Sequence, residues 1–519
     1  MRLAIGRRPQ PRGGTPDRVG IGRLAVLGAQ HVLIMYTGCV TVPLVFGAAA
    51  GLDAAAIAVL INADLLIAGI VTVIQGAGVG RVLGVRMPVV AGAAFAGVGP
   101  MILIADEYGV QAVYGSMLAA GLFGLLAAVP FARVVRFFPP VVSGVVITVV
   151  GLSLIEIGVH LVIGRDPEAA DHAAPSRIAL AAGVVAVILL VARFGRGFLS
   201  QVGVLVGLVL GTVVAVPMGL VSWSGVGGAD WLGVSAPFHF GAPQFPVVGV
   251  ISMCVVMLVL FAESTAGLLA VADLTGRELT PKDLARGLAA DGLSGVLGGV
   301  FNAFIDTVFS QNVGLVSMTK VRHRHVATAA GVILVVLGLI PKLGAVVAGL
   351  PEPVVGGVGL VMFATVAAVG IDTLRTVRFE GTNNLLVVAV AIGFGMAPVI
   401  APDFYAGFPD AVQIVLGSAV TGATLVAFLL NLFFSGAPGK AAAGTVPVGT
   451  VPAGTVPMGT VPAGTVPTGE DRADEVTADH ADHADPGRKR DRPREPEPSA
   501  GSGAGTGAQV GSGAPPAGR

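Results

Sequence analysis

Long apolar runs dominate this chain, and each is long enough to cross a membrane as a helix. About fourteen such runs recur between residues 24 and 434, and roughly twenty apolar residues suffice to span a hydrocarbon core of about 30 Å. Charged residues make up only 12% of the sequence, which is about half their usual share in soluble domains. The sequence therefore predicts an all-α polytopic membrane protein.

The spacing of the runs and the charges between them predict the topology. We expect the segments at 24–49, 55–77, 82–104, 110–131, 138–163, 178–194, 198–220, 246–273, 284–302, 305–319, 325–348, 354–372, 384–401 and 411–434. Lys and Arg concentrate in every second connection, as in "RVLGVR" (81–86), whereas the long connection at 222–245 has none. Because cytoplasmic loops carry the excess of Lys and Arg, both termini are expected in the cytoplasm and the chain in the inner (plasma) membrane.

Two segments do not read as plain helices. In "RMPVVAGAAFAGVGPMI" (86–102) and "GGVFNAFIDTVFSQNVGLVSMT" (298–319), glycine, proline or polar residues interrupt the apolar run. They are the third and the tenth of fourteen, so they occupy corresponding positions in two sets of seven. A repeat with an odd number of segments inserts its second copy upside down, and such a pair of interrupted segments points to a transport site at the midplane. The alternative is that the glycines only let helices pack closely.

Both ends of the chain differ from the apolar region. Residues 1–23 are rich in arginine and lack the apolar stretch of a signal peptide, which predicts a cytoplasmic tail. Residues 436–519 begin with repeats of the form GTVPx and continue with Asp, Arg, Pro, Gly and Ser, which predicts a disordered cytoplasmic tail. The 31 basic residues equal the 31 acidic ones, so no nucleic-acid partner is expected.

Several ionisable residues lie inside the predicted segments. Because a charged side chain at membrane depth has a high free-energy cost, each is a candidate for function. Glu263 follows a long apolar run with no basic residue nearby, which favours a carboxylate that binds substrate or a proton over a neutral acid bonded to a neighbouring helix. Asp291 opens the ninth segment, where an aspartate can also serve as a helix cap. Asp306 and Asp64 rank below Glu263.

Neutral polar residues form a second set of candidates. His31, early in the first segment, is either a structural residue or a group that exchanges protons near neutral pH. Gln311 and Asn312 are adjacent in the tenth segment. An amide offers donors and an acceptor in one plane, and a carboxylate accepts from ring N–H groups. Gln311 and Glu263 are thus suited to a flat heterocyclic base, although amides can equally hold helices together.

Four stretches carry these polar residues in a recognisable pattern: "QHVLIMYTG" (30–38), "FAESTAG" (261–267), "ADGLSG" (290–295) and "QNVGLVSMTK" (311–320). The chain resembles the nucleobase-ascorbate transporter family, the nucleobase:cation symporters that include xanthine, uric acid and uracil permeases. The family motif is Gln, Glu or Pro, then Asn, any residue, Gly, four further residues, Thr, and Arg, Lys or Gly. The last stretch fits every fixed position.

The resemblance covers about residues 24–435 and implies a fold. Family members have fourteen segments in two inverted seven-segment repeats, with short strands in segments 3 and 10. Segments 1–4 and 8–11 form a core domain, and segments 5–7 and 12–14 form a gate domain. Members usually form homodimers, so a homodimer within the lipid bilayer is expected here.

The resemblance also implies roles for individual residues. Glu263 and Gln311 match the residues that bind the base directly. Phe95 falls where the strand of segment 3 contributes a backbone N–H and an aromatic face, and Gly314 belongs to the same site. Several members have Asn or Thr where this chain has Ala96, so that contact is expected to be through the backbone only.

Coupling and selectivity have their own expected residues. Asp291 matches a carboxylate essential to the transport cycle, and His31 supports the polar network of the site, as does Asn312. Asn312 also affects affinity and selectivity, together with Thr319 and Lys320. Gln at position 311 favours oxidised purines over uracil.

The sequence thus predicts a secondary active transporter that imports a purine nucleobase, xanthine or uric acid, by proton symport. No chemical conversion, cofactor or metal is expected, and the coupling ion is H⁺, with Na⁺ as the alternative. A uracil permease of the same fold is the runner-up, and a membrane channel or a receptor is the alternative from a different class. The chain has no glycine-rich loop ending in Gly-Lys-Ser/Thr, which argues against an ATP-driven pump.

Overall fold

The computed structural model describes residues 20–134, 139–164, 166–169, 171–319 and 321–435. The prediction for the tail at 436–519, and most of that for residues 1–23, lies outside these residues. The helices, including the short 3₁₀ helices η1, η3 and η4, are α1 (Ile21–Ala49), α2 (Ala54–Ala77), η1 (Phe95–Gly97), α3 (Val98–Tyr108), α4 (Val110–Val134), α5 (Pro140–Ile163), α6 (Pro175–Phe194), α7 (Phe198–Gln201), α8 (Gly203–Ala215), η3 (Ser224–Val226), α9 (Val247–Thr275), α10 (Pro281–Phe301), α11 (Ser310–Thr319), α12 (His325–Gly338), α13 (Pro341–Ala348), α14 (Glu352–Leu374), α15 (Asn384–Ile400), η4 (Pro402–Tyr405), α16 (Asp410–Gly417) and α17 (Ala419–Ser435). The strands are β1 (Ala91–Ala93) and β2 (Asp306–Val308).

The described residues confirm a mostly helical, multi-pass membrane protein. Seven of their helices are long and apolar enough to cross a membrane, and an eighth span results if α12 and α13 count as one bent span. These seven are α1, α2, α4, α5, α6, α9 and α14. The helices α8, α15 and α17 are apolar but shorter. The count of fourteen segments and the inverted repeat therefore stay predictions.

Three segments that the sequence predicts as single helices are each two helices. The segment at 325–348 bends by 79° between α12 and α13, because Pro341 disfavours helical geometry at the residue before it. The segment at 198–220 breaks at Val202, and its helix α8 ends at Ala215, two residues before Pro217. The segment at 411–434 breaks at Ser418, whose hydroxyl accepts a hydrogen bond from the N–H of Thr421 (3.3 Å) as helix caps do.

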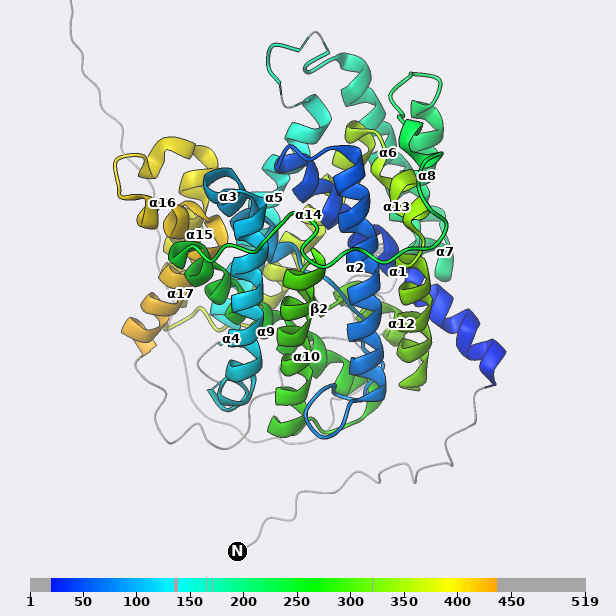
Figure 1. Cartoon of the computed structure of the whole chain (residues 1–519). Coiled ribbons are helices and arrows are strands. Elements are labelled where there is room, and N and C mark those ends of the chain that lie inside the picture. The colour runs from blue at the N-terminus through cyan, green and yellow to red at the C-terminus, as the bar shows by residue number, and fades with distance from the viewer. Residues whose placement is uncertain (1–19, 135–138, 165, 170, 320, 436–519) are drawn as a thin grey trace, which may run out of the picture. The chain divides into compact units, whose positions relative to one another are not determined.

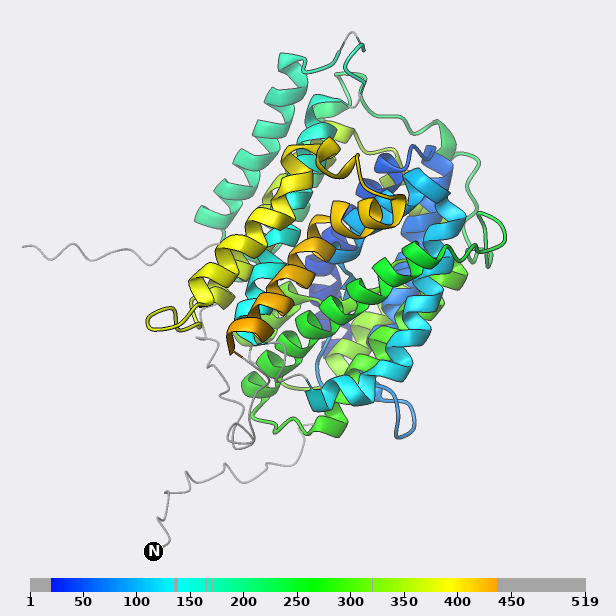
Figure 2. The same ribbon diagram turned by 90° about the vertical axis from the view of Figure 1, so that its left-hand side faces the viewer.

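The helices pack in two groups. In the first group α4 packs against α9 and α10, and α2 packs against α1, α10, α12 and α13 (Figure 1). In the second group α5 packs against α14, α15 and α17, and α6 packs against α8 and α14; Figure 2 shows α15 and α17 side by side. Glycines permit close approach within the first group: Gly121 of α4 and Gly292 of α10 each lie against backbone atoms of the other helix.

A two-stranded antiparallel ribbon lies inside the first group. Its register pairs Ala91 with Val308 and Ala93 with Asp306. Both strands are completely buried, and they fall inside the two ranges, 86–102 and 298–319, that the sequence marks as interrupted. The chain leaves α10 through Asn302, which adopts a left-handed conformation (φ 61°) and accepts a hydrogen bond from the N–H of His239 (2.8 Å). Asparagine tolerates this conformation better than most residues, so α10 ends there and β2 follows.

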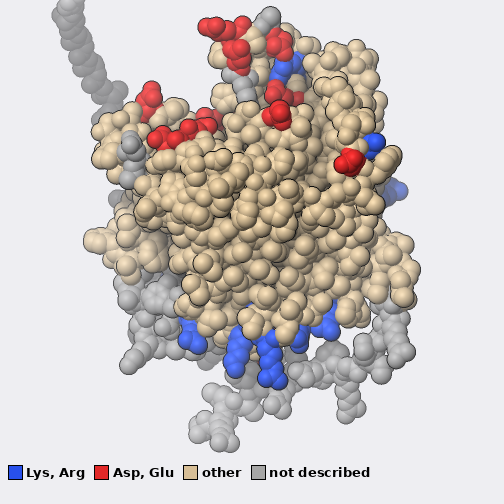
Figure 3. Space-filling view, in the orientation of Figure 1, with Lys and Arg blue, Asp and Glu red and all other residues tan. Residues whose placement is uncertain are grey.

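Charged side chains separate to two ends of the molecule. On the face shown in Figure 3, most Lys and Arg gather at the lower end and most Asp and Glu at the upper end, with an uncharged band between them. We call these the basic end and the acidic end. At the basic end Arg286 donates to the carbonyl of Arg81 (2.8 Å) and Arg277 to that of Arg86 (2.9 Å). The uncharged band is what a hydrocarbon layer requires.

Candidate functional site

Side-chain hydroxyls hold the edges of the buried ribbon. The hydroxyl of Thr72 on α2 accepts from the N–H of Ala91 (3.0 Å). On the other strand, Ser264 of α9 accepts from the N–H of Val308 (3.2 Å), and Ser294 of α10 accepts from that of Asp306 (2.8 Å). Backbone that is not helical survives at membrane depth only when its polar groups find partners inside the protein. These hydroxyls therefore keep the ribbon in place between α2, α9 and α10.

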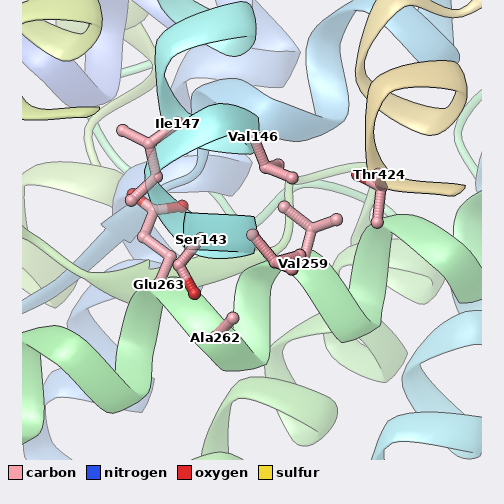
Figure 4. Close-up of a pocket in the computed structure, with 8 residues that line it drawn as sticks. Ser143, Val146, Ile147, Val259, Ala262, Glu263 and Thr424 are labelled. Atoms are coloured by element: carbon pink, nitrogen blue, oxygen red, sulfur yellow. The ribbon is translucent and has the colours of Figure 1, made fainter. Parts of the chain in front are cut away.

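Glu263 lies on α9 where the two helix groups meet. It lines a small pocket whose other residues come from α5, α9 and α17, namely Val142, Ser143, Val146, Ile147, Val259, Ala262 and Thr424. Figure 4 shows Glu263 at the same end of the pocket as Ser143 and Ile147, opposite Thr424. The carboxylate thus sits on the first helix group and faces the second.

The pocket is very small. Its free volume is about 10 Å³, which corresponds to about one water molecule. A heterocyclic base is much larger, so α9 must separate from α5 and α17 before a base can reach Glu263 through this pocket.

Asp291 is deeply buried and does not cap a helix. Helix α10 begins at Pro281 rather than at 284, and its cap is Thr280. The Thr280 side chain accepts from the N–H of Asp283, and the Asp283 side chain accepts from the N–H of Thr280. The capping alternative for Asp291 is therefore wrong. Gln75 of α2 donates to one oxygen of the Asp291 carboxylate (3.2 Å), and the Ser264 side chain interacts favourably with that carboxylate. Asp291 also lies within electrostatic range of Glu263.

His31 and Asn312 are joined across the first group. The Nδ1 atom of His31 on α1 is 2.8 Å from Oδ1 of Asn312 on α11, so this nitrogen carries the proton and donates. Both side chains are buried. Asn312 is also the point where α11 leaves the ribbon, since its N–H donates to the carbonyl of Phe309 (3.1 Å). The pair therefore fixes the start of α11 against α1.

The remaining predicted substrate residues lie on η1 and α11 and do not line the pocket of Glu263. Phe95 of η1 is 8% exposed, and its ring packs edge-to-face on Phe363 of α14, with centroids 5.6 Å apart. Ala96 is buried and Gln311 is half-buried. Beside Gly314, no described atom lies within 4 Å of the place that a Cβ would take. Helix α9 packs against η1, β2 and α11, so the fold brings these elements together around one helix.

Thr319, one of the predicted selectivity residues, is the last residue of α11. The hydroxyl of Thr319 donates to the carbonyl of Leu315 (2.8 Å), one turn back on the same helix. Lys320 lies outside the described residues. Thr319 is therefore bonded within its own helix.

Several residues of the site escape prediction from the sequence. Ser264 and Ser294 support the ribbon, Gln75 binds Asp291, and Ser143 and Thr424 share the pocket of Glu263. Serine and threonine are common in membrane helices, where they usually bond to their own backbone. Only Ser264 carried a signal, because it directly follows Glu263.

No described Lys or Arg forms an ion pair with the carboxylates of this site. The ion pairs of the described residues are those of Arg177, Arg277, Arg286 and Arg375, and of His160 with Glu156. An unpaired carboxylate at membrane depth is expensive, so Glu263 and Asp291 are poised to take up a proton or to bind a ligand.

The apolar spans, the buried ribbon and a carboxylate between two helix groups define a multi-pass membrane permease. A family model described as "Permease family" matches residues 22–404. The uric acid transporter UacT of Escherichia coli (strain K12) is 42% identical over 418 residues, which cover 80% of this chain and 86% of that protein. The xanthine permease of Bacillus subtilis (strain 168) is 40% identical over 418 residues, covering 80% of this chain and 95% of that protein. The chain belongs to the nucleobase-ascorbate transporter family, as its resemblance implied.

Solved structures of other membrane proteins share this fold. The structure of SLC26A9 superposes with a TM-score of 0.55 at 13% sequence identity, covering 80% of this chain and 66% of that one. Murine Slc26a9 in its inward-facing state has a TM-score of 0.54, also at 13% identity. At this level of identity the likeness concerns the fold alone.

Proposed function

We propose that this protein is a secondary active transporter that imports a purine nucleobase, xanthine or uric acid, by proton symport. The observation that carries the proposal is Glu263, which has no cationic partner among the described residues and lies in a pocket between two helix groups. The relatives of this chain include a uric acid transporter and a xanthine permease. In this proposal Glu263 accepts from ring N–H groups, and the amide of Gln311 makes paired hydrogen bonds to the ring edge. The base is moved without chemical conversion.

Transport would follow an elevator-like cycle. The first helix group acts as a core that carries the base, and the second acts as a gate. The pocket at Glu263 is too small for a base, so the groups must separate to load and unload it. Fourteen segments in two inverted repeats, with the site at the midplane, would give the two similar end states that alternating access needs.

Proton coupling would depend on Glu263 and Asp291. Their carboxyl groups lie within electrostatic range of each other, so a proton on one favours the charged state of the other. Coupling requires that substrate and proton bind the two facing states with different affinities. Protonation of Glu263 or Asp291 would favour movement of the loaded core, with His31 and Asn312 supporting the site.

The remaining features of the proposal concern the setting of the protein. The basic end of Figure 3 is proposed to face the cytoplasm, in the plasma (inner) membrane and with both termini inside. A homodimer is proposed as the assembly. Selectivity among nucleobases is assigned to Asn312, Thr319 and Lys320.

The test is uptake of labelled xanthine by cells that lack their own purine permeases. Unlabelled uric acid should compete, whereas uracil should not, and a proton uncoupler should abolish accumulation. Competition by uracil alone would favour a uracil permease, and conduction without accumulation would favour a channel. Deletion of 436–519 should leave uptake intact, whereas a receptor that signals through this tail would lose its response.

A further inference from the structure

Two buried carboxyl groups take no part in the mechanism proposed above. Asp64 of α2 and Asp306 of β2 are both 0% exposed. No described protein group donates a hydrogen bond of good geometry to any of their four carboxylate oxygens. The backbone N–H of Phe304 interacts favourably with Asp64 without reaching that geometry. An ionised carboxylate in this position is strongly destabilised unless a proton or another cation compensates it.

The two carboxyl groups interact with each other. Helix α2, which carries Asp64, packs against β1, and β1 pairs Ala93 with Asp306. Asp64 and Asp306 lie within electrostatic range as a result, and Asp306 is also within range of Asp291. Through Asp291 the series of carboxyl groups continues to Glu263. Three buried acids, Asp64, Asp306 and Asp291, thus extend from the interior of the first helix group toward the carboxylate in the pocket.

The described groups that face the pair supply no positive charge. Cys39 from α1 and Tyr114 from α4 interact with Asp64, and Asp291 from α10 interacts with Asp306. The basic groups on the other elements packed against α2 are engaged elsewhere or exposed. His31 is bonded to Asn312, Lys342 of α13 lies over the ring of Trp231, and His325, at the start of α12, is exposed.

Tyr114 gives a second, independent indication that this place holds a ligand. Its side chain is 2% exposed, and its hydroxyl has no hydrogen-bond partner among the described residues although it interacts with Asp64. Its ring stacks on Phe240 at a centroid distance of 5.8 Å, which holds the hydroxyl in place. Among the described residues no group of three or more His, Cys, Asp or Glu is arranged to hold a metal ion. A proton is the cation that two carboxyl groups and a hydroxyl suit.

We propose that Asp64 and Asp306 form a second proton-binding site in which the two carboxyl groups share one proton. On loading, one carboxylate takes up H⁺ and becomes a carboxylic acid, and its O–H donates to the other carboxylate. The charge of the pair changes from −2 to −1, and two carboxyls in one dry site cannot both ionise cheaply. On loading, the hydroxyl of Tyr114, which has no hydrogen-bond partner among the described residues and interacts with Asp64, turns to donate to the carboxylate that remains charged. This inference rests on the proposed proton symport, because it assigns a further carrier of the coupled proton.

The position of Asp306 gives the pair a route to the substrate site. Asp306 begins β2, and the chain passes from β2 through Phe309 to α11, which carries Gln311. Asp306 is held at its backbone by Ser294, whose hydroxyl also donates to the carbonyl of Asp291 (2.7 Å). A change of charge at Asp64 and Asp306 therefore acts on β2 and Ser294, which position the proposed substrate site.

The test uses the purified full-length protein in proteoliposomes and the double variant Asp64→Asn/Asp306→Asn, which removes both carboxyl groups and with them the proton that they share. Counterflow of labelled xanthine, which needs no net proton movement, should stay within about threefold of wild type, whereas accumulation driven by a proton gradient should fall about tenfold or more. The infrared band of a protonated carboxyl group should weaken in the double variant. Asp273→Asn, which removes an exposed carboxyl group from the end of α9, is the matched control and should change neither reading.

A milder variant guards against a double variant that fails to fold. Tyr114→Phe keeps the ring on Phe240 and removes only the hydroxyl, and it should shift the pH of half-maximal accumulation by about one unit. Accumulation at the wild-type level and an unchanged infrared band in the double variant would overturn the proposal of a shared proton. Accumulation by the wild type that follows a sodium gradient instead of a proton gradient would also overturn it. Absence of purine counterflow in the wild type would refute the proposed function, while the infrared band would still report on the pair.

Discussion

Carboxyl groups at the two ends of the molecule and carboxyl groups in its interior have opposite surroundings. At the acidic end, Arg177 binds Asp171 (2.8 Å) and Glu352 (2.9 Å). At the basic end, Asp283 lies 3.5 Å from Arg277 and 3.2 Å from Arg286. In contrast, Glu263 and Asp291 have no cationic partner among the described residues. Acidic side chains at the ends thus pair with arginine where water lowers the free-energy cost of their charge. In the interior, Glu263 and Asp291 are left free to bind a proton or a ligand.

The largest expected effect is at the interior carboxylate. Glu263→Gln keeps the shape of the side chain and removes its charge, so it should lower uptake of labelled xanthine about 100-fold or more. Gln311→Ala should do the same, because the planar amide is lost. Surface expression measured in parallel shows that each variant reaches the membrane, and Asp273→Asn serves as the control. Wild-type uptake by either variant would contradict the site assignment.

A smaller loss is expected where a hydroxyl supports the interior. Ser264→Ala removes the acceptor for the N–H of Val308, and it should lower uptake about tenfold, which corresponds to the loss of one hydrogen bond. The neighbouring Thr265→Ser is a matched control, since the Thr265 hydroxyl donates only to the carbonyl of Phe261 on its own helix (2.6 Å). Equal uptake by Ser264→Ala and Thr265→Ser would show that the ribbon does not need this support.

The acidic end should respond in stability rather than in transport. Arg177→Met removes a side chain that is 11% exposed and leaves Asp171 and Glu352 unpaired. Because these two carboxylates are 61% and 46% exposed, water screens them, and the expected loss is only about 1–2 kcal/mol. The thermal midpoint in detergent should fall while the affinity for the transported base stays unchanged. A loss of transport at full stability would place Arg177 in the transport cycle instead.

The smallest effect is expected at the basic end and depends on pH. Partial burial opposes ionisation of Asp283, but the hydrogen bonds from Thr280 and the charges of Arg277 and Arg286 outweigh it and lower its pKa below the ordinary value. The stabilisation is therefore present at neutral pH and is lost as the pH falls through the lowered pKa. Asp283→Asn should reduce stability by less than about 1 kcal/mol at pH 7. The difference in thermal midpoint between this variant and wild type should disappear at acidic pH. A difference that does not change with pH would show that packing, rather than charge, causes it.

The sequence singled out individual polar residues as candidates for the site, but it did not predict which groups they contact. Glu263, Asp291, His31 and Asn312 stood out because polar side chains are rare in apolar segments. Their partners did not stand out. The Asn312 oxygen that binds His31 belongs to a residue 281 positions away, and the Gln75 that binds Asp291 is 216 positions away. Such distances along the chain are bridged only when helices pack, and no local pattern reports that packing.

The sequence by itself determined the membrane class, the interrupted segments and the motif that marks the family, because hydropathy, glycine and proline act on their own neighbourhood. Only the tertiary structure decided which carboxyl groups meet. It also decided that Asp291 is no cap, that Pro341 bends its segment by 79°, and that the pocket at Glu263 is closed to a base. The physical reason is that the charge state and access of a buried acid depend on the groups packed around it, and here these groups come from helices that are distant in the sequence.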